Sequence, residues 1–258
     1  MFSTRGLGKE MTYDWTDDLA KRQLGDYRNC QPGTFFGDKD CRAIALSDAY
    51  RVSIKLSELR RSGGDHPIGY KIGCTSPGIY AAFGIRGPVM GFLYEEEMQE
   101  YACKLKSSNF YNLAIEAEMA IRVGHDLQVE SVFPIIELHN FEFRGETNTL
   151  QELVANNCFN AGIVMPDEIT DQSGAECANL KLEINGNSIE EGSPWCFANG
   201  PDGSLEWIAE KLVDHDLELK PGNIVLAGTN LGIHRVKPGD HIAVYLNEKL
   251  RVESHVVP

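Results

Sequence analysis

The chain has 258 residues, with 24 Lys and Arg against 38 Asp and Glu, so its formal net charge is −14 with the seven histidines counted as neutral. A nucleic acid is bound by basic surfaces that displace its counterions, and no basic run interrupts this acidic sequence, so we exclude DNA and RNA as partners. The hydrophobic fraction of 42% and the charged fraction of 24% are typical of a folded globular protein. The length allows one large domain, or one with a small appendage.

The sequence also argues against a membrane protein or an exported one. No segment approaches the ~18 apolar residues of a membrane span, and the first thirty residues carry charges instead of an apolar leader. The seven cysteines form no CxxC pair, and their odd number prevents complete internal pairing. We therefore expect reduced thiols and a cytoplasmic protein without a membrane partner.

The first part of the chain is predicted to be helical. Apolar residues recur at helical spacing up to about residue 65, and the run of turn-forming residues from Ser62 to Pro67 ends this pattern. We therefore divide the chain into a helical N-terminal region, residues 1–65, and a second domain, residues 66–258.

The second domain is predicted to be rich in strands and of the mixed α+β class. Short β-type runs alternate with turns, and the alternation in Leu180–Ile184, followed by Asn185-Gly186, predicts an antiparallel hairpin. Further strands are expected at 68–72, 90–93, 114–123, 135–138, 161–165, 224–227, 241–245 and 250–256. Two helices are expected at 149–156 and 205–214.

The strongest chemical signal is the pair Glu116 and Glu118 in the run AIEAEMAI (114–121). Alternate residues of a strand share one face, so both carboxylates would project side by side. A solvated strand face is the ordinary explanation of such a pair. The apolar residues between the two acids favour a second explanation, in which the carboxylates are buried and neutralised by a cation or by protons.

A third acid, Glu137, interrupts the apolar run FPIIE (133–137). One interpretation is a buried acid paired with Lys or Arg. In the other, Glu116, Glu118 and Glu137 lie on adjacent strands and form an oxygen-only site suited to Mg²⁺ or Mn²⁺. His139 follows two positions later and is a ligand, a base, or simply a hydrogen-bonded side chain.

Two further segments hold candidate substrate contacts. In GYKIGCTSP (69–77), Lys71 is either an ordinary surface lysine or points inward, where its cation would stabilise developing enolate charge, and Thr75 or Ser76 is a candidate helix N-cap. Gly228-Thr229 follows a predicted strand and is equally explained as a turn or as a carboxylate-binding loop. The sequence has no phosphate-binding glycine loop and no GxSxG motif.

Six segments taken in order resemble one family: GYKIGCTS (69–76), GPVMGFL (87–93), IEAEMAI (115–121), FPIIE (133–137), LVANNCFNAG (153–162) and GNIVLAGT with VKPGDHI (222–242). They are similar to the 2-keto-4-pentenoate hydratase and 4-oxalocrotonate decarboxylase branch of the fumarylacetoacetate hydrolase superfamily, over residues 66 to 258. The resemblance implies a β-rich, roll-like fold that forms homo-oligomers.

The resemblance also implies the roles of individual residues. A divalent metal, usually Mg²⁺, would be bound by Glu116, Glu118 and Glu137. The active-site lysine of the family would be Lys71. The contacts to the substrate carboxylate would lie near Thr75, Asn157 and Gly228-Thr229.

The chain departs from the family pattern at three places. Pro88-Val89-Met90-Gly91 replaces a P-D-F/Y-G motif, Leu138-His-Asn-Phe-Glu142-Phe replaces V-G-S-R-I, and Asn156-Asn157 replaces Asp-Asn. The groups that select and protonate the substrate are therefore altered, which leaves His139 and Glu142 as candidates for the proton donor or base.

The leading functional hypothesis is a metal-dependent lyase that hydrates a small 2-hydroxy-2,4-dienoate, a 2-oxo acid in its dienol form. The alternatives are decarboxylation of a vinylogous 2-oxo acid, hydrolysis of a C–C bond in an acylpyruvate with His66 as the early histidine, and a non-catalytic member of the family.

Overall fold

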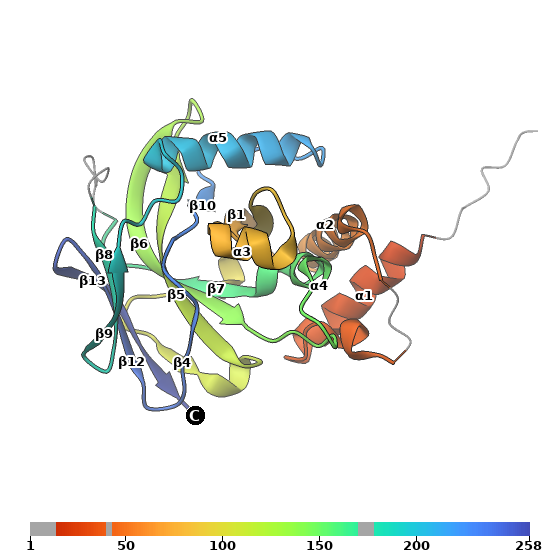
Figure 1. Cartoon of the computed structure of the whole chain (residues 1–258), viewed down its shortest axis with the longest axis horizontal. Coiled ribbons are helices and arrows are strands. Elements are labelled where there is room, and N and C mark those ends of the chain that lie inside the picture. Colours follow the sequence, from red (N-terminus) through yellow and green to blue (C-terminus); the bar gives the residue numbers. More distant parts are fainter. Residues whose placement is uncertain (1–13, 40–42, 170–177) are drawn as a thin grey trace, which may run out of the picture.

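The structure, a computed structural model, describes residues 14–39, 43–169 and 178–258. Cys41 and Cys177 lie outside the described residues, as does the start of the predicted N-terminal region. The described residues form two β-sheets with helices around them (Figure 1). No helix in these ranges is long and apolar enough to cross a membrane.

The larger sheet has eight strands. Seven follow one path, and the eighth, β11 (His234–Arg235), pairs with β5. In spatial order the seven are β2 (Val89–Tyr94), β1 (Pro67–Gly73), β10 (Ile224–Leu226), β5 (Leu113–Val123), β6 (Val129–Asn140), β7 (Asn160–Val164) and β3 (Met98–Gln99).

The smaller sheet has five strands and packs against β5 and β6 of the larger one. Figure 1 shows it on the left of the molecule. Its strands, in spatial order, are β4 (Lys104–Lys106), β13 (Lys249–Val257), β12 (His241–Leu246), β8 (Leu180–Ile184) and β9 (Asn187–Gly192). The predicted β8–β9 hairpin is confirmed, and Asn185 and Gly186 have the positive φ angles, 56° and 75°, that its tight turn requires.

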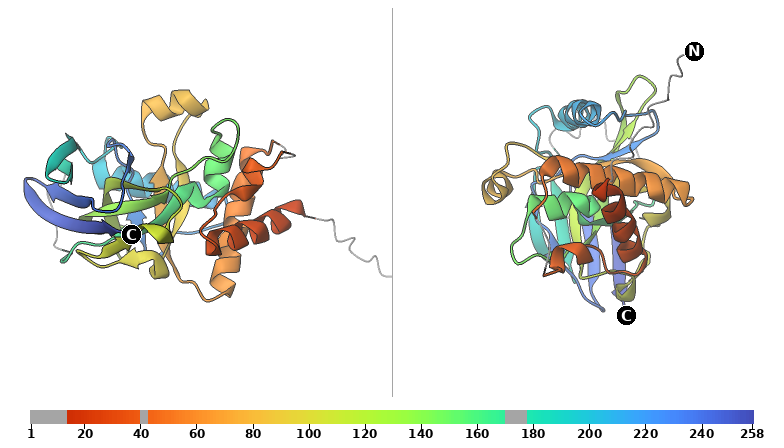
Figure 2. Two further views of the ribbon diagram at one scale, coloured as in Figure 1. Left: turned by 90° about the horizontal axis from the view of Figure 1, so that it is seen from below. Right: turned by 90° about the vertical axis from the view of Figure 1, so that its right-hand side faces the viewer.

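Within the described ranges, five α-helices surround the sheets: α1 (Trp15–Arg28), α2 (Leu46–Ser62), α3 (Pro77–Phe83), α4 (Leu150–Ala155) and α5 (Gly200–Val213). Short 3₁₀ helices occur at Thr34–Gly37, Glu95–Glu97, Ser107–Asn109 and Asn157–Phe159. Helices α1, α2 and α4 gather at the end of the molecule away from the smaller sheet (Figures 1 and 2). The β-rich mixed fold is thus confirmed, and every described strand begins at or after Pro67.

The strand that carries Glu137 is longer than predicted, because β6 pairs with β5 along almost the whole length of both. The sequence indicated only 135–138, yet the strand also includes the polar residues Glu130 and Ser131. This pairing places Glu137 directly opposite Glu116. The register of the β5–β6 pairing therefore sets the distance between two of the predicted ligands.

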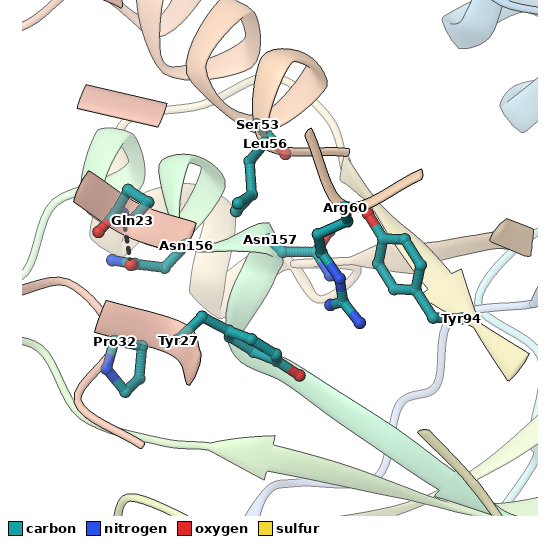
Figure 3. Close-up of a pocket in the computed structure, with 9 residues that line it drawn as sticks. All are labelled: Gln23, Tyr27, Pro32, Ser53, Leu56, Arg60, Tyr94, Asn156 and Asn157. Carbon is teal, nitrogen blue, oxygen red and sulfur yellow. Dashed lines mark hydrogen bonds between the residues drawn. The ribbon is translucent and has the colours of Figure 1, made fainter. Parts of the chain in front are cut away.

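The N-terminal helices are tied to the rest of the fold around a buried arginine (Figure 3). The Arg60 guanidinium of α2 lies 2.6 Å from an Asp65 oxygen and 2.7 Å from a Glu97 oxygen. Its central carbon is 4.7 Å from the centre of the Tyr27 ring and 3.5 Å from that of Tyr94. Tyr27 also donates its hydroxyl to Glu97, so α1, α2 and the chain after β2 meet at this point.

Arg60→Ala should lower the free energy of unfolding by about 3 kcal/mol or more, because removal of one partner leaves the Glu97 carboxylate buried without its cation. Urea denaturation followed by circular dichroism measures the change. Arg61→Ala, on the exposed side of α2, should stay within about 0.5 kcal/mol of the parent protein. A loss of less than about 1 kcal/mol for Arg60→Ala would show that this cluster does not anchor the helices.

Candidate metal centre and active site

Glu116, Glu118, Glu137 and His139 project from one face of the β5–β6 ladder. Glu116 and Glu118 are two residues apart on β5, Glu137 and His139 are two apart on β6, and Glu116 is opposite Glu137. Glu118, Glu137 and His139 are at most 1% exposed, and Glu116 is half-buried. Three carboxylates therefore lie on one largely buried surface.

Lys71 brings a cation to these carboxylates from β1. Its Nζ lies 2.8 Å from Glu137 Oε1, and its side chain is 4% exposed. The amide of Asn160 on β7 also donates to Glu137 Oε1, at 2.7 Å. Lys71 thus points inward, and Glu137 is paired with a cation as the first interpretation of its sequence context expected.

Burial and charge shift the pKa values of these groups in different directions. Burial and the neighbouring carboxylates of Glu137 and Glu116 raise the pKa of Glu118 well above its usual range. Burial alone would raise the pKa of Glu137, but Lys71 and His139 outweigh burial and hold it below its usual value. Burial alone would lower the pKa of Lys71, but the carboxylates, Glu137 above all, raise it, so its ammonium stays charged.

The arrangement leaves buried polar atoms available to a ligand. Nε2 of His139 lies 3.5 Å from a Glu116 oxygen and 3.5 Å from a Glu137 oxygen, and ligand atoms of these three residues fall within 4.8 Å of one another. Within the described part of the chain, Glu137 Oε2 and both ring nitrogens of His139 have no hydrogen-bond partner. Buried polar atoms are normally satisfied, so these residues fit a bound divalent cation.

A cavity of about 530 Å³ opens onto this face. Lys71, Glu116, Glu118 and His139 line it together with Thr75 and Thr229. The Thr75 hydroxyl donates to the Thr229 carbonyl at 2.7 Å, and the Thr229 hydroxyl accepts from the Leu231 backbone at 3.0 Å. The two threonines therefore hold the loop after β10 at the rim of the acidic face.

Gly228 faces the carboxylates through its backbone. Its N–H donates to Glu118. Its φ is +80°, and a Cβ there would lie 2.5 Å from Thr75 Cγ2 and 2.7 Å from Cys196 Sγ. Only glycine fits such a backbone at this contact, so the residue serves the site by bringing its N–H close.

Five sequence candidates lie outside the cavity lining: Glu137 and Gly228, which contact its residues, and Asn157, Glu142 and His66, which are bonded elsewhere. The Asn157 amide is bonded to the Phe92 backbone on β2, accepting at 2.7 Å and donating at 2.9 Å. The Glu142 carboxylate accepts from Asn112 at 2.6 Å and lies 3.3 Å from the Arg235 guanidinium. The exposed imidazole of His66 pairs with Glu96 instead.

Sequence reasoning missed two parts of the site. Asn160, the partner of Glu137, stood within the segment LVANNCFNAG, where only Asn157 was selected. The apolar wall of the cavity includes Phe141, Phe143 and Phe159. The pattern FEF at 141–143, directly after the His139 strand, was the available signal for two of these rings.

No family model matches the chain. The 2-hydroxyhexa-2,4-dienoate hydratase of Comamonas testosteroni is 25% identical over 213 residues, which are 76% of this chain and 81% of the hydratase. The structure is similar to 4-oxalocrotonate decarboxylase from Pseudomonas putida G7 complexed with magnesium and adipate, with a TM-score of 0.84 and 20% identity over 98% of this chain and all of that one.

The likeness extends to a fumarylacetoacetate hydrolase family protein from Yersinia pestis CO92, with a TM-score of 0.53 and 16% identity over 74% of this chain and 93% of that one. In sequence the chain is similar to a dienoate hydratase and in fold to 4-oxalocrotonate decarboxylase, which supports the resemblance of its motifs to the hydratase and decarboxylase branch of the fumarylacetoacetate hydrolase superfamily. The decarboxylase structure matches 98% of this chain, whereas the Yersinia structure matches 74% of it.

The effects of single substitutions on Mg²⁺ affinity should distinguish the metal ligands among the carboxylates from His139. With the three carboxylates as ligands, Glu116→Gln should weaken Mg²⁺ binding by more than 100-fold, and His139→Gln, which alters only a neighbour of the ligands, should weaken it by about 10- to 100-fold. Isothermal titration calorimetry measures both affinities. Equal losses for His139→Gln and Glu116→Gln, with little loss for Glu118→Gln, would put His139 in the coordination sphere in place of Glu118.

Asn157→Ala should lower the free energy of unfolding by about 2 kcal/mol or more, because it leaves a buried N–H and a buried carbonyl of Phe92 without partners. Chemical denaturation measures the loss, and Asn109→Ala, at an exposed position, serves as the matched control. Unchanged stability together with a raised KM would instead indicate that Asn157 contacts the substrate.

Proposed function

We propose that this protein is a divalent-metal-dependent lyase that hydrates a 2-hydroxy-2,4-dienoate. The observation that carries the proposal is the convergence of Glu116, Glu118 and Lys71 in the wall of one cavity, with Glu137 held directly behind them by its ion pair with Lys71. The relationship to dienoate hydratases supports the reaction class. Decarboxylation of a vinylogous 2-oxo acid is the second candidate, because a named 4-oxalocrotonate decarboxylase shares the fold along the whole chain.

The three glutamates would hold Mg²⁺, the ion bound in the decarboxylase structure, or Mn²⁺. When bound, the ion supplies a Lewis acid for the 2-oxo oxygen and the carboxylate of the substrate. Oxygen ligands of this kind suit both ions.

The residues around the metal ligands would bind the substrate and transfer its protons. The charged Lys71 stabilises the enolate oxygen as negative charge develops there, and the Thr75 and Thr229 loops receive the substrate carboxylate beside the N–H of Gly228. His139 is the proposed proton donor or base, because it lines the cavity whereas Glu142 is bonded to Asn112 outside it.

The other candidate reactions have less support. Hydrolysis of a C–C bond in an acylpyruvate requires a base positioned for water, and the side chain of His66 is 71% exposed and bound to Glu96. A purely structural protein would gain nothing from three carboxylates on one largely buried surface. We further propose that the enzyme forms homo-oligomers, is cytoplasmic and takes part in aromatic catabolism. Its catalytic domain would consist of residues 66–258.

The test is the loss of ultraviolet absorbance of a 2-hydroxy-2,4-dienoate on addition of the protein and Mg²⁺. Activity should disappear with EDTA and return with excess Mg²⁺. Lys71→Met should lower kcat by about 100-fold or more, because an electrostatic contact to the developing oxyanion is lost, while the exposed Lys249→Met should leave it unchanged. Circular dichroism verifies that each variant is folded.

Assays of the products separate the candidate reactions. Hydration yields a 4-hydroxy-2-oxo acid, whereas decarboxylation releases CO₂ from a substrate with a further carboxyl group. Full metal-dependent activity in Lys71→Met, or no turnover of any dienoate by the metal-loaded parent protein, would contradict the hydratase assignment.

A further inference from the structure

The cavity has an acidic, metal-binding face and a second wall that is apolar. This second wall consists of residues from α3, from the segment after β6 and from the region of α4 and β7: Ile79, Phe83, Phe141, Phe143, Leu153 and Phe159. Phe141 lies only two residues beyond His139, so the apolar wall continues directly from the acidic face. A substrate held by its 2-oxo acid end would therefore extend its other end along this wall.

Four phenylalanines of the wall form one continuous aromatic cluster. The ring centres of Phe143 and Phe159 are 4.8 Å apart with the rings nearly perpendicular. Phe83 lies 6.1 Å from Phe143, and Phe141 lies 6.2 Å from Phe159. These are the distances and orientations of packed aromatic side chains, so the four rings support one another as one wall.

The described lining offers no cation for a second carboxylate of a substrate. Lys71 and His139 are its only basic side chains, and both lie among the metal-binding glutamates. Arg235 is 5.7 Å from the Phe141 ring centre, but its guanidinium lies 3.3 Å from the Glu142 carboxylate and donates to the Phe141 carbonyl. A carboxylate placed against the phenylalanines would be desolvated without a partner, which is costly.

The cavity is also larger than the smallest dienoates need. A five-carbon 2-hydroxydienoate has eight non-hydrogen atoms, which fill on the order of 240 Å³ at the roughly 30 Å³ that one water-sized group occupies in a liquid. The cavity measures about 530 Å³. More than half of it therefore remains for a tail, and its phenylalanines suit an apolar one.

We infer that this enzyme selects 2-oxo acids with a bulky apolar tail, aryl or alkyl, and discriminates against those with a second, terminal carboxylate. The aromatic cluster of Phe83, Phe141, Phe143 and Phe159 is the specificity determinant. Binding of the tail removes apolar surface from water on both partners, and exclusion of dicarboxylates follows from the absence of a paired cation in the described wall. This inference rests on the proposed function and names its substrate class.

The experiment measures binding rather than turnover, by calorimetric titration of the Mg²⁺-loaded protein with three unreactive 2-oxo acids. These are pyruvate, 2-oxo-5-phenylpentanoate and 2-oxoadipate, which share the chelating end and differ in the tail. The phenyl compound should bind at least tenfold more tightly than pyruvate, and 2-oxoadipate should bind no more tightly than pyruvate.

The outcomes separate this inference from the proposed function. If 2-oxoadipate binds as tightly as the phenyl compound, or if all three bind alike, the specificity inference is overturned while metal-dependent 2-oxo acid binding stands. If none binds in a metal-dependent way, the proposed function itself fails and the specificity inference fails with it.

A matched pair of variants locates the effect. Phe143→Ala should weaken binding of 2-oxo-5-phenylpentanoate about tenfold and leave pyruvate affinity within about twofold, which also verifies that the variant is folded. Phe35→Ala removes a ring from the N-terminal helical region, where Phe35 packs on Phe36 at 5.2 Å, and should change neither affinity. Equal losses for the phenyl compound in both variants would refute the assignment of specificity to the aromatic cluster.

Discussion

The ion pair between Lys71 and Glu137 is the interaction on which the arrangement of the site depends. Lys71 is on β1 and Glu137 on β6, with β10 and β5 between them. In a flat sheet, three strand spacings would separate these strands by about 14 Å. The two residues are also displaced from each other along the strands. Lys71 pairs with Leu226, which in turn pairs with Ala120 of β5, whereas Glu137 pairs with Glu116 of β5.

That offset of four residues is about 13 Å along the strands, so the two side chains could not meet across a flat sheet. Their 2.8 Å contact therefore requires the sheet to curve strongly around its concave face. The long, bent β5 and β6 provide this curvature (Figure 1). The same curvature leaves space above the acidic face, and the cavity occupies it. The curvature of the larger sheet thus both brings Lys71 to Glu137 and forms the cavity.

The charge balance of this face explains why a cation belongs there. One lysine opposes three carboxylates, in a chain whose net charge is already −14. The raised pKa of Glu118 limits the repulsion, because it favours a proton on that carboxyl. A divalent ion would remove the need for that proton and bring the charge of this face from −2 to neutral, which lowers the local repulsion of an anionic substrate in an acidic protein.

The sequence predicted the strand-borne groups because alternation along a strand determines which residues share a face. Glu116 and Glu118 could be placed together from spacing alone, Glu137 and Lys71 were candidates from their apolar sequence context, and the family resemblance assigned all four residues their roles. The aromatic wall could not be predicted in this way. Phe83, Phe143 and Phe159 come from three different segments, and only the curved sheet and helices α3 and α4 bring them together. Arg60 was missed for the same reason, since its partners Glu97 and Tyr27 are distant in sequence.

The turn that presents Phe159 to the cavity gives a physical reason for the Asn157 contacts. Asn157, Cys158 and Phe159 have φ angles of 54°, 53° and 58°, the left-handed region that non-glycine residues rarely occupy in succession. Each such residue costs about 1 kcal/mol or more, so the turn persists only where other interactions hold it. The two Asn157 bonds to Phe92 and the bond from the Cys158 thiol to the Met90 carbonyl attach it to β2.

These contacts connect the apolar wall to β2, which is the direct neighbour of β1, the strand that carries Lys71. Gly91 lies at the closest approach, where a Cβ would be 3.0 Å from the Asn157 carbonyl and 3.2 Å from Lys71 Cγ. A change at this glycine would therefore press on the lysine and on the strained turn together. Strand β2 thus contacts both the turn that carries Phe159 and the strand that carries Lys71, so a substitution that reshapes the apolar wall from this side should also shift Lys71.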